Sequence, residues 1–515
     1  MNMTDVVLGP ALARGQENDA AILCAGGTVT FGQLAERVNR AGNVFAATGI
    51  GKGMRVLLLV TDRPEFFYVY LGLLKIGAIP VALNLRLSAA DIAFTIDDSA
   101  CTGFVLEAQF AAQFEEATAM ASIKPAAFSV DAPMHGYGHI PALMEAASAQ
   151  LAPVLSAPDD PGFWMYSSGT TGKPKGVVHC QRTALDAKNT LGQLMEVGPG
   201  DRVFASSKLF FAFSMAHVMF AALNLGAAAI LYPDWPDAEA VGEIVETYQP
   251  TILLSVPTFY RNMLRDGVAK GAGFKDVRYY LSAGEKLPRT LFDAWAEATG
   301  RPVLEGIGAT ETCFLFLANR PDHMSPGTCG VPTPGTEVKI LAQGGGPEIA
   351  PGEAGVLWVR MGCLAQGYWN LDERSGAVFK DGWYCTNDMF CIDDAGFYEY
   401  QGRADDMLKI SGQWVSPNEI EERVLANPLV DEAAVVGVPN EDGLIRLALF
   451  MVVPDAGADT AQFEKALQDD LSQNLSIYKC PRRLFYLDEM PLTATGKLQR
   501  FALRDIAINS DAGAG

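Results

Sequence analysis

The central part of this sequence alternates short apolar runs with segments of helical periodicity. The apolar runs have the length of strands and occupy residues 203–207, 228–232, 251–256, 277–284 and 303–308. Helical patterns separate them at about 237–248, 258–265 and 290–299. Strands that are apolar on both faces and alternate with helices are typical of parallel sheets covered by helices. The pattern therefore predicts an α/β fold.

The N-terminal region continues this pattern. Residues 30–45 have helical periodicity, and Thr30 with Gln33 at their start matches a capping box. Residues 55–60 form an apolar run of strand length. The longest apolar run, residues 66–83, contains a lysine and a proline in its second half. A buried helix followed by a strand explains that run better than a membrane span.

The length of 515 residues exceeds what one ordinary core holds, so several domains are expected. From about residue 327 glycine and proline become frequent between short strands, which predicts a small β subdomain over 327–404. The polar stretch 402–406 precedes roughly 110 residues with their own strand and helix alternation. We expect a large N-terminal domain over 1–404, which includes the β subdomain, and a small α+β C-terminal domain over 405–515.

The charge balance excludes one class of partner. The chain has 39 basic and 60 acidic side chains, a formal net charge of −21. Nucleic-acid affinity depends on Lys and Arg, so no nucleic-acid partner is expected.

Nine scattered cysteines without a CxxC pair are typical of reduced thiols in the cytosol. The first residues lack the layout of a signal peptide, and a cytoplasmic protein without an integral membrane segment is expected.

The stretch YSSGTTGKPKGVVH, residues 166–179, is rich in glycine and hydroxyl side chains. It is not a Walker A motif, because the spacing of its glycines differs and Pro174 follows Lys173. Glycine lets backbone N–H groups approach a phosphate, hydroxyls add donors and a lysine neutralises charge. The stretch therefore predicts a phosphate-binding loop rather than a surface turn, with the candidate contacts Ser167, Ser168, Gly169, Thr170, Thr171 and Lys175.

Six segments, taken in order, resemble the motifs of the adenylate-forming superfamily, which contains acyl-CoA synthetases, luciferases and the adenylation domains of peptide synthetases. The segments cover most of the chain: 166–179, 282–288, 306–312, 382–390, 402–421 and 491–500. The resemblance implies an ATP- and Mg²⁺-dependent enzyme that joins an acid to the thiol of coenzyme A. It also implies that the small C-terminal domain is mobile.

The resemblance assigns the nucleotide contacts. It places the loop on the β- and γ-phosphates of ATP, Thr310 on the α-phosphate and Glu311 on Mg²⁺. Asp388 would bind the ribose hydroxyls and Arg403 the ribose or a phosphate. The backbone of 282–288 would lie against the adenine, which gives Ala283, Gly284 and Glu285 as predicted nucleotide contacts. Gly308, from the motif 306–312, is the remaining one. Two positions depart from the family pattern: Ile307 stands where an aromatic residue is usual, and Asn387 where glycine is usual.

The resemblance also assigns roles to the C-terminal segments. Lys497 would be the catalytic lysine of adenylate formation, together with Thr310 and Glu311, and Asp405 the hinge. A loop for the second half-reaction would contain Lys409, Ser411, Gly412 and Trp414. The chemistry agrees, because attack of a carboxylate on the α-phosphorus brings two anions together. A lysine and a metal ion aimed at that charge stabilise the transition state.

Residues 208–217 and 309–320 look most like the benzoate-CoA ligase branch of the superfamily. On that pattern the acyl pocket is walled by Ala212, Phe213, Gly308, Phe314 and Leu315. Phe213 stands where tyrosine is common and Phe314 where histidine is common, so a plain apolar acid is favoured over a hydroxylated one. The alternative is that these aromatics belong to the core. His217 borders the acyl pocket or the coenzyme A channel, or else is a satisfied interior histidine.

These observations predict an AMP-forming acid–CoA ligase for a benzoate-like aryl or alicyclic acid. The enzyme would form an acyl adenylate with release of pyrophosphate and then the thioester. No acidic residue lies between Lys208 and Gly226, which disfavours amino acids as substrates. The alternatives are a medium-chain fatty acyl-CoA synthetase, an enzyme that loads a separate carrier protein, and a non-catalytic nucleotide-binding regulator. A homodimer is left open.

Overall fold

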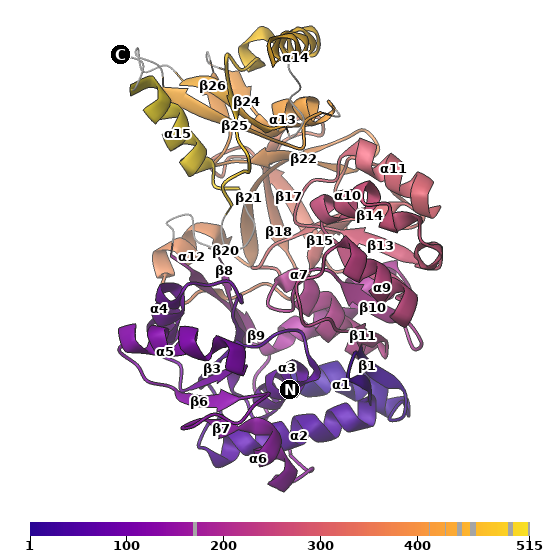
Figure 1. Cartoon of the computed structure of the whole chain (residues 1–515), viewed down its shortest axis with the longest axis vertical. Helices are drawn as coiled ribbons and strands as arrows, with labels where there is room; N and C mark the ends of the chain where they lie inside the picture. Colours follow the sequence, from indigo (N-terminus) through magenta and orange to yellow (C-terminus); the bar gives the residue numbers. More distant parts are fainter. Residues whose placement is uncertain are drawn as a thin grey trace. The chain divides into compact units, whose positions relative to one another are not determined.

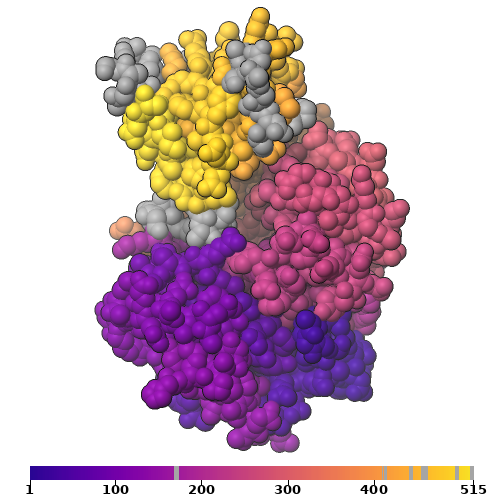
Figure 2. All heavy atoms as spheres, in the orientation of Figure 1, coloured from indigo at the N-terminus to yellow at the C-terminus, as the bar shows by residue number. Residues whose placement is uncertain are grey.

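A computed structural model of the chain describes residues 1–167, 173–410, 413–427, 429–439, 445–453, 460–492 and 498–512. Figure 1 traces the chain from its N-terminus to its C-terminus, and Figure 2 draws its heavy atoms in the same sequence colours. The chain divides into two compact units. The first comprises residues 1–338 and 358–385, and the second comprises 339–357 and 386–515. The predicted boundary between residues 404 and 405 stays a prediction.

One sheet of the first unit has nine strands in the order β16-β15-β14-β13-β12-β10-β11-β1-β2. Their bounds are β1 Ala20–Cys24, β2 Gly27–Thr30, β10 Arg202–Ala205, β11 Ala228–Ile230, β12 Ile252–Ser255, β13 Tyr279–Ser282, β14 Val303–Gly308, β15 Leu315–Ala318 and β16 Val331–Pro332. The six central strands from β14 to β1 run parallel, and antiparallel strands close both edges. All five apolar runs that predicted a parallel sheet are strands of it, so the predicted α/β class is confirmed.

The predicted helices of this region pack against the nine-stranded sheet. They are α9 Ala238–Tyr248, α10 Pro257–Arg265 and α11 Arg289–Thr299 (Figure 1). Tyr260, Tyr280 and Trp295 are buried where these helices meet the sheet, and their rings pack edge to face. Such aromatic packing buries a large apolar area between the helices and the sheet.

The second sheet of the first unit has eight strands in the order β19-β9-β8-β4-β3-β5-β6-β7. Their bounds are β3 Arg55–Leu59, β4 Ile79–Ala82, β5 Gly103–Leu106, β6 Ala126–Ser129, β7 Gly138–His139, β8 Pro161–Ser167, β9 Lys175–Cys180 and β19 Gly367–Tyr368. Strands β8 and β9 form an antiparallel hairpin in which Ser167 pairs with Lys175. The predicted phosphate-binding loop therefore joins two strand ends, and its residues 168–172 lie outside the described residues.

Six helices of the N-terminal region accompany the second sheet. They are α1 Met3–Ala13, α2 Phe31–Ala47, α3 Pro64–Lys75, α4 Ala89–Ser99, α5 Ala111–Met120 and α6 Ile140–Ala146, with the short η1 Ala108–Phe110 before α5. Helix α2 begins with the predicted capping box of Thr30 and Gln33. Helix α3 followed by β4 confirms the prediction for residues 66–83. Among the helices that the structure describes, none combines the length and apolarity needed to cross a membrane.

Short and irregular helices follow several strands of the first unit. The segment after β9 contains η2 Gln181–Lys188 and the π-helical η3 Asn189–Leu194. After β10 the chain forms α7 Ala212–Ser214, the π-helical η4 Met215–Ala221 and α8 Ala222–Leu225. The 3₁₀ turns η5 Val268–Lys270 and η6 Ala272–Lys275 follow α10. Single π-helical turns occur frequently at functional sites, and η4 contains His217.

The short strands expected after residue 327 are present. They are β17 Glu337–Leu341, β18 Gly355–Arg360, β20 Phe379–Lys380, β21 Trp383–Ile392 and β22 Tyr398–Arg403, with helix α12 Asp372–Val378 before β20. Strand β21 pairs with β20 and β22 in antiparallel register. The division into two units falls within β17, β18 and β21 in the sequence.

The second unit contains a three-stranded sheet in the order β25-β26-β27 and a separate hairpin. The sheet strands are β25 Glu432–Pro439, β26 Ile445–Val452 and β27 Arg483–Tyr486, and the hairpin strands are β23 Leu408–Ile410 and β24 Gln413–Val415. The helices are α13 Pro417–Leu425, α14 Thr460–Asn474, η7 Ile477–Lys479 and α15 Arg500–Ala512. Alternate residues of β25 are buried on opposite faces: Val435 packs with Ile420 and Leu467, whereas Val436 packs with Leu503.

Candidate active site

The loop between β14 and β15 contains two of the predicted catalytic residues, Thr310 and Glu311. Its turn is closed by hydrogen bonds, in which the Ala309 amide donates to Thr312 Oγ1 at 3.0 Å. Cys313 adopts a left-handed φ of 60°, which is uncommon for residues other than glycine, asparagine and aspartate. The loop holds Thr310 half-exposed and turns the Glu311 side chain into the protein.

Glu311 is the centre of a buried cluster of polar groups. Its side chain is 8% exposed, and Lys175 Nζ lies 2.8 Å from its Oε1. The Tyr368 hydroxyl donates to the same oxygen at 2.7 Å. The Lys175 ammonium also lies 4.0 Å from the centre of the Tyr368 ring. The structure therefore brings together Lys175 from β9, Glu311 from the loop after β14 and Tyr368 from β19.

These contacts decide the charge of the cluster. Burial raises the pKa of the Glu311 carboxyl, but the Lys175 charge and the hydrogen bonds from Lys175 and Tyr368 outweigh burial and lower that pKa to about 2. Burial and the neighbouring carboxylate raise the pKa of Tyr368 above its usual value, so the phenol stays a donor. Glu311 is therefore an ionised carboxylate in a site that is nearly closed to water.

His179 supports the same loop from strand β9. Its ring is fully buried, stacks on Phe163 with centroids 4.7 Å apart, and places Nε2 2.8 Å from the Thr310 carbonyl. A carbonyl only accepts, so Nε2 carries the proton. Burial, which outweighs that hydrogen bond and the Glu311 charge, lowers the His179 pKa to about 4. The neutral ring therefore fixes the backbone beside Glu311.

Sequence reasoning assigned no role to His179 and Tyr368. A polar residue inside the apolar run of residues 177–180 was the available signal for His179. Tyr368 gave no comparable signal, because its role depends on the pairing of β19 with β9, where it lies opposite Val177.

The base of the predicted phosphate-binding loop is held by contacts on both strands. The Tyr166 hydroxyl donates to Asp98 Oδ2 at 2.6 Å, and Trp369 Nε1 donates to the Asp98 carbonyl at 2.8 Å. The Trp369 amide donates to the Gly176 carbonyl at 2.8 Å. Ser167 Oγ is buried without a hydrogen-bond partner in the described part of the chain. The other predicted loop contacts, Ser168, Gly169, Thr170 and Thr171, lie outside the described residues.

The segment predicted to lie against adenine follows β13. Ala283 is buried, whereas Gly284 is exposed with a left-handed φ of 90°. Glu285 Oε2 accepts from the amide of Thr258 at 3.1 Å and from its hydroxyl at 2.7 Å. The Glu285 carboxylate therefore binds the first turn of α10, while the backbone at Gly284 is accessible. Contact of these residues with adenine stays a prediction.

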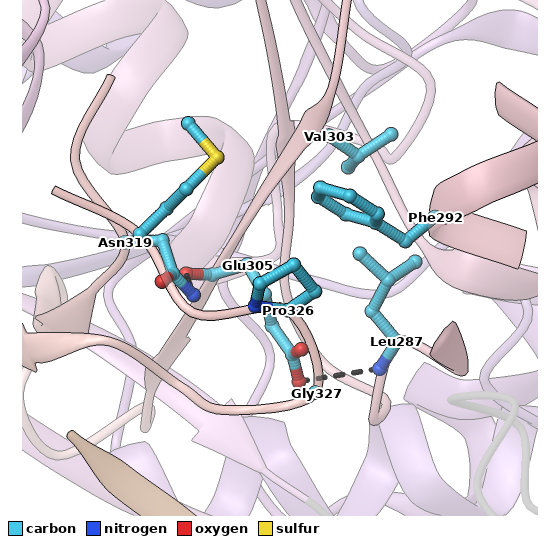
Figure 3. Close-up of a pocket in the computed structure, with 8 residues that line it drawn as sticks. Leu287, Phe292, Val303, Glu305, Asn319, Pro326 and Gly327 are labelled. Carbon is cyan, nitrogen blue, oxygen red and sulfur yellow. Dashed lines mark hydrogen bonds between the residues drawn. The ribbon is translucent and has the colours of Figure 1, made fainter. Parts of the chain in front are cut away.

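A small hollow is lined in part by Leu287, near the end of this segment (Figure 3). Leu287 and Phe292 face Pro326 across it, and the Leu287 amide donates to Glu305 Oε1 at 3.2 Å. The lining residues are Leu287, Phe292, Val303, Glu305, Asn319, Met324, Pro326 and Gly327. None of the predicted site residues is among them, and the hollow is no part of the site described above.

The predicted acyl-pocket residues come from two elements. Ala212 and Phe213 are half-exposed in α7, and Gly308 is exposed at the end of β14. Phe314 and Leu315 follow the Glu311 loop and are buried. A Cβ at Gly308 would lie 2.9 Å from the Phe314 carbonyl oxygen, so only glycine fits there without movement. The two elements meet at His217, whose ring contacts Phe213 and Phe314.

A buried ion pair anchors the chain that leads into α7. Lys208 donates to the carbonyls of Tyr232, at 2.7 Å, and Asp234, and its Nζ lies 3.8 Å from Asp62 Oδ2. Asp62 Oδ1 also accepts from the Leu209 amide at 3.1 Å. Burial outweighs the Lys208 charge and raises the Asp62 pKa to about 6. The pair holds the start of the predicted acyl-pocket segment.

The second unit contains the predicted ribose contacts. Asp388 and Arg403 lie opposite each other on β21 and β22, with Arg403 Nη1 3.0 Å from Asp388 Oδ1. Arg403 Nη1 also donates to the Thr386 carbonyl at 2.9 Å. Asn387 has a left-handed φ of 57°, which explains why glycine is usual at this position and why asparagine replaces it with little strain. The predicted hinge residue Asp405 is exposed, and its Oδ2 lies 3.6 Å from Arg403 Nη2.

The predicted catalytic lysine, Lys497, lies outside the described residues, which omit 493–497. Leu492 and Leu498 on either side of that segment pair in an antiparallel bridge, and the Gln499 amide donates to the Pro491 carbonyl at 2.8 Å. Arg500 then binds both oxygens of Glu421, at 2.6 and 3.0 Å. The residues flanking the predicted lysine are therefore well anchored.

The predicted loop for the second half-reaction is described only in part. Ile410 pairs with Gln413 in the β23–β24 hairpin. Ser411 and Gly412 lie outside the described residues, as do the side chains of Lys409 and Trp414. Their role in thioester formation stays a prediction.

Family models match most of the chain. Residues 11–369 match the AMP-binding enzyme model, and residues 419–497 match the model of the AMP-binding enzyme C-terminal domain.

Curated relatives match over nearly the full length. The 3-hydroxybenzoate–CoA ligase of Aromatoleum sp. (strain CIB) is 45% identical over 98% of this chain and 97% of its own. The benzoate–CoA ligase of Thauera aromatica is 36% identical over 98% of this chain and 95% of its own. The crystal structure of the anthranilate CoA ligase AuaEII in complex with anthranoyl-AMP matches with a TM-score of 0.91 at 30% identity, over 99% of this chain and 98% of that one.

Proposed function

The chain belongs to the AMP-binding enzyme family, and from this premise we propose that it is an ATP-dependent ligase that joins an aryl carboxylic acid to coenzyme A. The enzyme first forms an acyl adenylate with release of pyrophosphate and then the acyl-CoA thioester. The observation that carries the proposal is the buried cluster of Lys175, Glu311 and Tyr368. Glu311 of this cluster directly follows Thr310, the predicted α-phosphate contact, in the sequence. The aryl acid is supported by the relatives, which act on 3-hydroxybenzoate and benzoate.

The first half-reaction needs positive charge where two anions meet. A carboxylate oxygen attacks the α-phosphorus, the bond to the bridging oxygen breaks, and pyrophosphate leaves with that electron pair. Lys175 is the first residue of β9, directly after the predicted phosphate loop, where its ammonium can neutralise phosphate charge. His179 holds the Thr310 carbonyl, which keeps the neighbouring Thr310 side chain in position. Asp388 and Arg403 of the second unit are the proposed ribose contacts.

Glu311 is the proposed protein ligand of Mg²⁺. It is ionised, and carboxylate oxygen is a ligand that Mg²⁺ prefers. Lys175 and Tyr368 both reach Oε1, so the carboxylate also has a second oxygen to offer. No group of three or more His, Cys, Asp or Glu side chains suited to a metal occurs within the described ranges. This fits Mg²⁺, which is commonly held by one or two carboxylates together with substrate phosphates and water and neutralises phosphate charge.

The second half-reaction transfers the acyl group to the thiol. The coenzyme A sulfur attacks the adenylate carbonyl carbon, the bond to the AMP oxygen breaks, and the thiol proton is released. We propose that Lys497 serves only the first step and that the segment 409–414 serves the second, with Asp405 as the hinge.

Substitution of Lys497 by alanine separates the two half-reactions. Adenylate formation, followed as pyrophosphate release, is expected to fall by orders of magnitude, because the fixed cation between carboxylate and phosphate is lost. Thioester formation from pre-made acyl adenylate is expected to persist. Equal loss in both assays would show that Lys497 does not have this role.

Pyrophosphate release with a panel of acids tests the proposed activity itself. The panel contains benzoate, its hydroxylated and fluorinated derivatives, cyclohexanecarboxylate, octanoate and phenylalanine, each with and without coenzyme A. Turnover that requires both an aryl acid and coenzyme A supports the proposal. Turnover with octanoate alone, or one equivalent of release that stalls with coenzyme A, would instead indicate a fatty acid or a carrier protein. No release with any acid would favour a nucleotide-binding regulator.

We further propose a cytoplasmic enzyme. Light scattering of the purified protein decides between a monomer and a homodimer.

A further inference from the structure

His217 lies in the π-helical turn η4, four residues after Phe213. Its ring is fully buried. The ring contacts Phe213 edge to face with centroids 5.2 Å apart, and it contacts Phe314 in the same manner at 5.9 Å. Because these two aromatics are predicted walls of the acyl pocket, His217 is the polar side chain that lies between them.

The hydrogen bonds of His217 define which ring nitrogen can accept. Nδ1 lies 2.7 Å from the Phe213 carbonyl, which only accepts, so Nδ1 carries the proton. In a neutral ring Nε2 then presents a lone pair. Nε2 is buried, and no hydrogen-bond partner for it occurs among the residues that the structure describes. Proteins rarely leave a buried polar atom unpaired, so Nε2 calls for a donor that the described residues do not supply, such as a water molecule or a ligand.

The surroundings keep this ring neutral. Burial, opposed only by the hydrogen bond to Phe213, lowers the His217 pKa to about 4. The rings that pack against it, Phe213 and Phe314, carry no charge. Nε2 is therefore a neutral acceptor at physiological pH, suited to a donor group that has no charge of its own.

We propose that His217 Nε2 accepts a hydrogen bond from the ring hydroxyl of the acid, so that the preferred substrate is a hydroxylated benzoate rather than benzoate itself. The inference rests on the proposed ligase function and deepens it. A phenolic hydroxyl can donate to Nε2, whereas a methoxy group, a fluorine or a bare C–H cannot. The 3-position is the first candidate, because the relative that is 45% identical to this chain acts on 3-hydroxybenzoate.

This assignment changes the expectation drawn from Phe213 and Phe314. Those two residues lack the polar groups common in the benzoate branch, and on their own they favour a plain apolar acid. His217 supplies a polar group between them. A site that offers a buried acceptor disfavours an analogue that leaves it unpaired. We expect wild-type enzyme to prefer the best hydroxybenzoate over benzoate and over the matching methoxybenzoate by roughly tenfold to hundredfold in kcat/KM.

The test compares wild type with His217→Leu and His217→Gln, using 2-, 3- and 4-hydroxybenzoate, benzoate and the methoxybenzoates. The readout is the ratio of kcat/KM for hydroxylated acid to that for benzoate. His217→Leu should bring this ratio toward one, whereas His217→Gln, which retains a polar side chain, should restore part of it. Met219→Leu is the matched control, because Met219 is fully buried on the same helical turn and its exchange conserves volume. Its ratio should equal that of wild type.

Two results would overturn the inference. One is a wild-type enzyme that turns over benzoate and every hydroxybenzoate equally well. The other is a His217→Leu or His217→Gln enzyme that keeps the wild-type ratio. If His217→Leu does not fold, His217→Gln decides, because it should lower the ratio. Absence of pyrophosphate release with every acid would instead refute the proposed ligase function, so the two failures are distinguishable.

Discussion

Replacement of Tyr368 by phenylalanine removes one hydroxyl from the centre of the site. That hydroxyl donates to Glu311 Oε1 at 2.7 Å, and the Glu311 side chain is 8% exposed. Water therefore has little access to replace the lost donor. Lys175 remains 2.8 Å from the same oxygen, so Glu311 stays ionised at neutral pH.

A hydrogen bond to a charged group contributes about 1.5–3 kcal/mol. If the whole amount were lost in the transition state of adenylate formation, the rate would fall roughly 10- to 150-fold. Lys175 still neutralises and orients the carboxylate, so we expect the lower end, a loss of about tenfold in kcat/KM for ATP.

The assay is acid-dependent exchange of pyrophosphate into ATP, which reports the first half-reaction alone. Tyr260→Phe is the matched control, because the buried Tyr260 hydroxyl lies 3.0 and 3.1 Å from two neutral carbonyl oxygens, those of Leu253 and Leu281. It should lower thermal stability, by about 1 kcal/mol, without changing the exchange rate.

A Tyr368→Phe enzyme with wild-type exchange would refute the reasoning that this phenol orients the catalytic carboxylate. The same conclusion would follow if thioester formation from pre-made adenylate fell as much as exchange.

Three further perturbations have defined outcomes. Asp62→Asn leaves Lys208 buried without its counter-charge and should lower the free energy of unfolding, measured by thermal unfolding, by about 3 kcal/mol. The Asp62→Leu/Lys208→Met double variant should recover most of this loss. A double variant as unstable as the single one would contradict the reasoning. His217→Gln removes a group whose pKa falls from 6.5 unfolded to about 4 folded. The neutral ring's contribution to the free energy of unfolding is fully present above pH 6.5 and is lost as the pH falls toward 4, by about 2 kcal/mol at pH 5. The variant lacks this group, so its Tm should fall less than that of wild type between pH 7.5 and 5. Asp388→Asn should raise KM for ATP about tenfold or more with little change in KM for the acid, because one charge-assisted hydrogen bond to the ribose is lost. An unchanged KM for ATP would show that Asp388 does not bind the nucleotide.

Much of the fold followed from local patterns. The apolar runs that became β10 to β14 and the capping box that begins α2 were readable because strand and helix periodicity and cap chemistry depend on neighbouring residues. The motif resemblance also pointed to Lys175 and Glu311 separately. It did not predict that they pair with each other, and it gave no role to Tyr368 or His179.

Those contacts join residues far apart in the chain. Glu311 is 136 residues from Lys175 and 57 from Tyr368. Whether such side chains meet depends on strand order and register, here the pairing of β19 with β9 and the turn after β14. A shift of one residue in register would point a strand's side chains to the opposite face, and no local pattern records that register.

The sequence alone therefore determined the α/β class, the order of the motifs and the chemical types of the proposed site residues. A helix or a half-buried strand repeats its apolar residues with a fixed period, so the type of an element is recorded in consecutive residues. Only the tertiary structure decided that a buried carboxylate shares one oxygen with a lysine and a phenol, and that His217 lies between Phe213 and Phe314 with Nε2 unpaired in the described part of the chain. Such environments arise from long-range packing, which sets the solvation, the pKa and the hydrogen-bonding partner of each group.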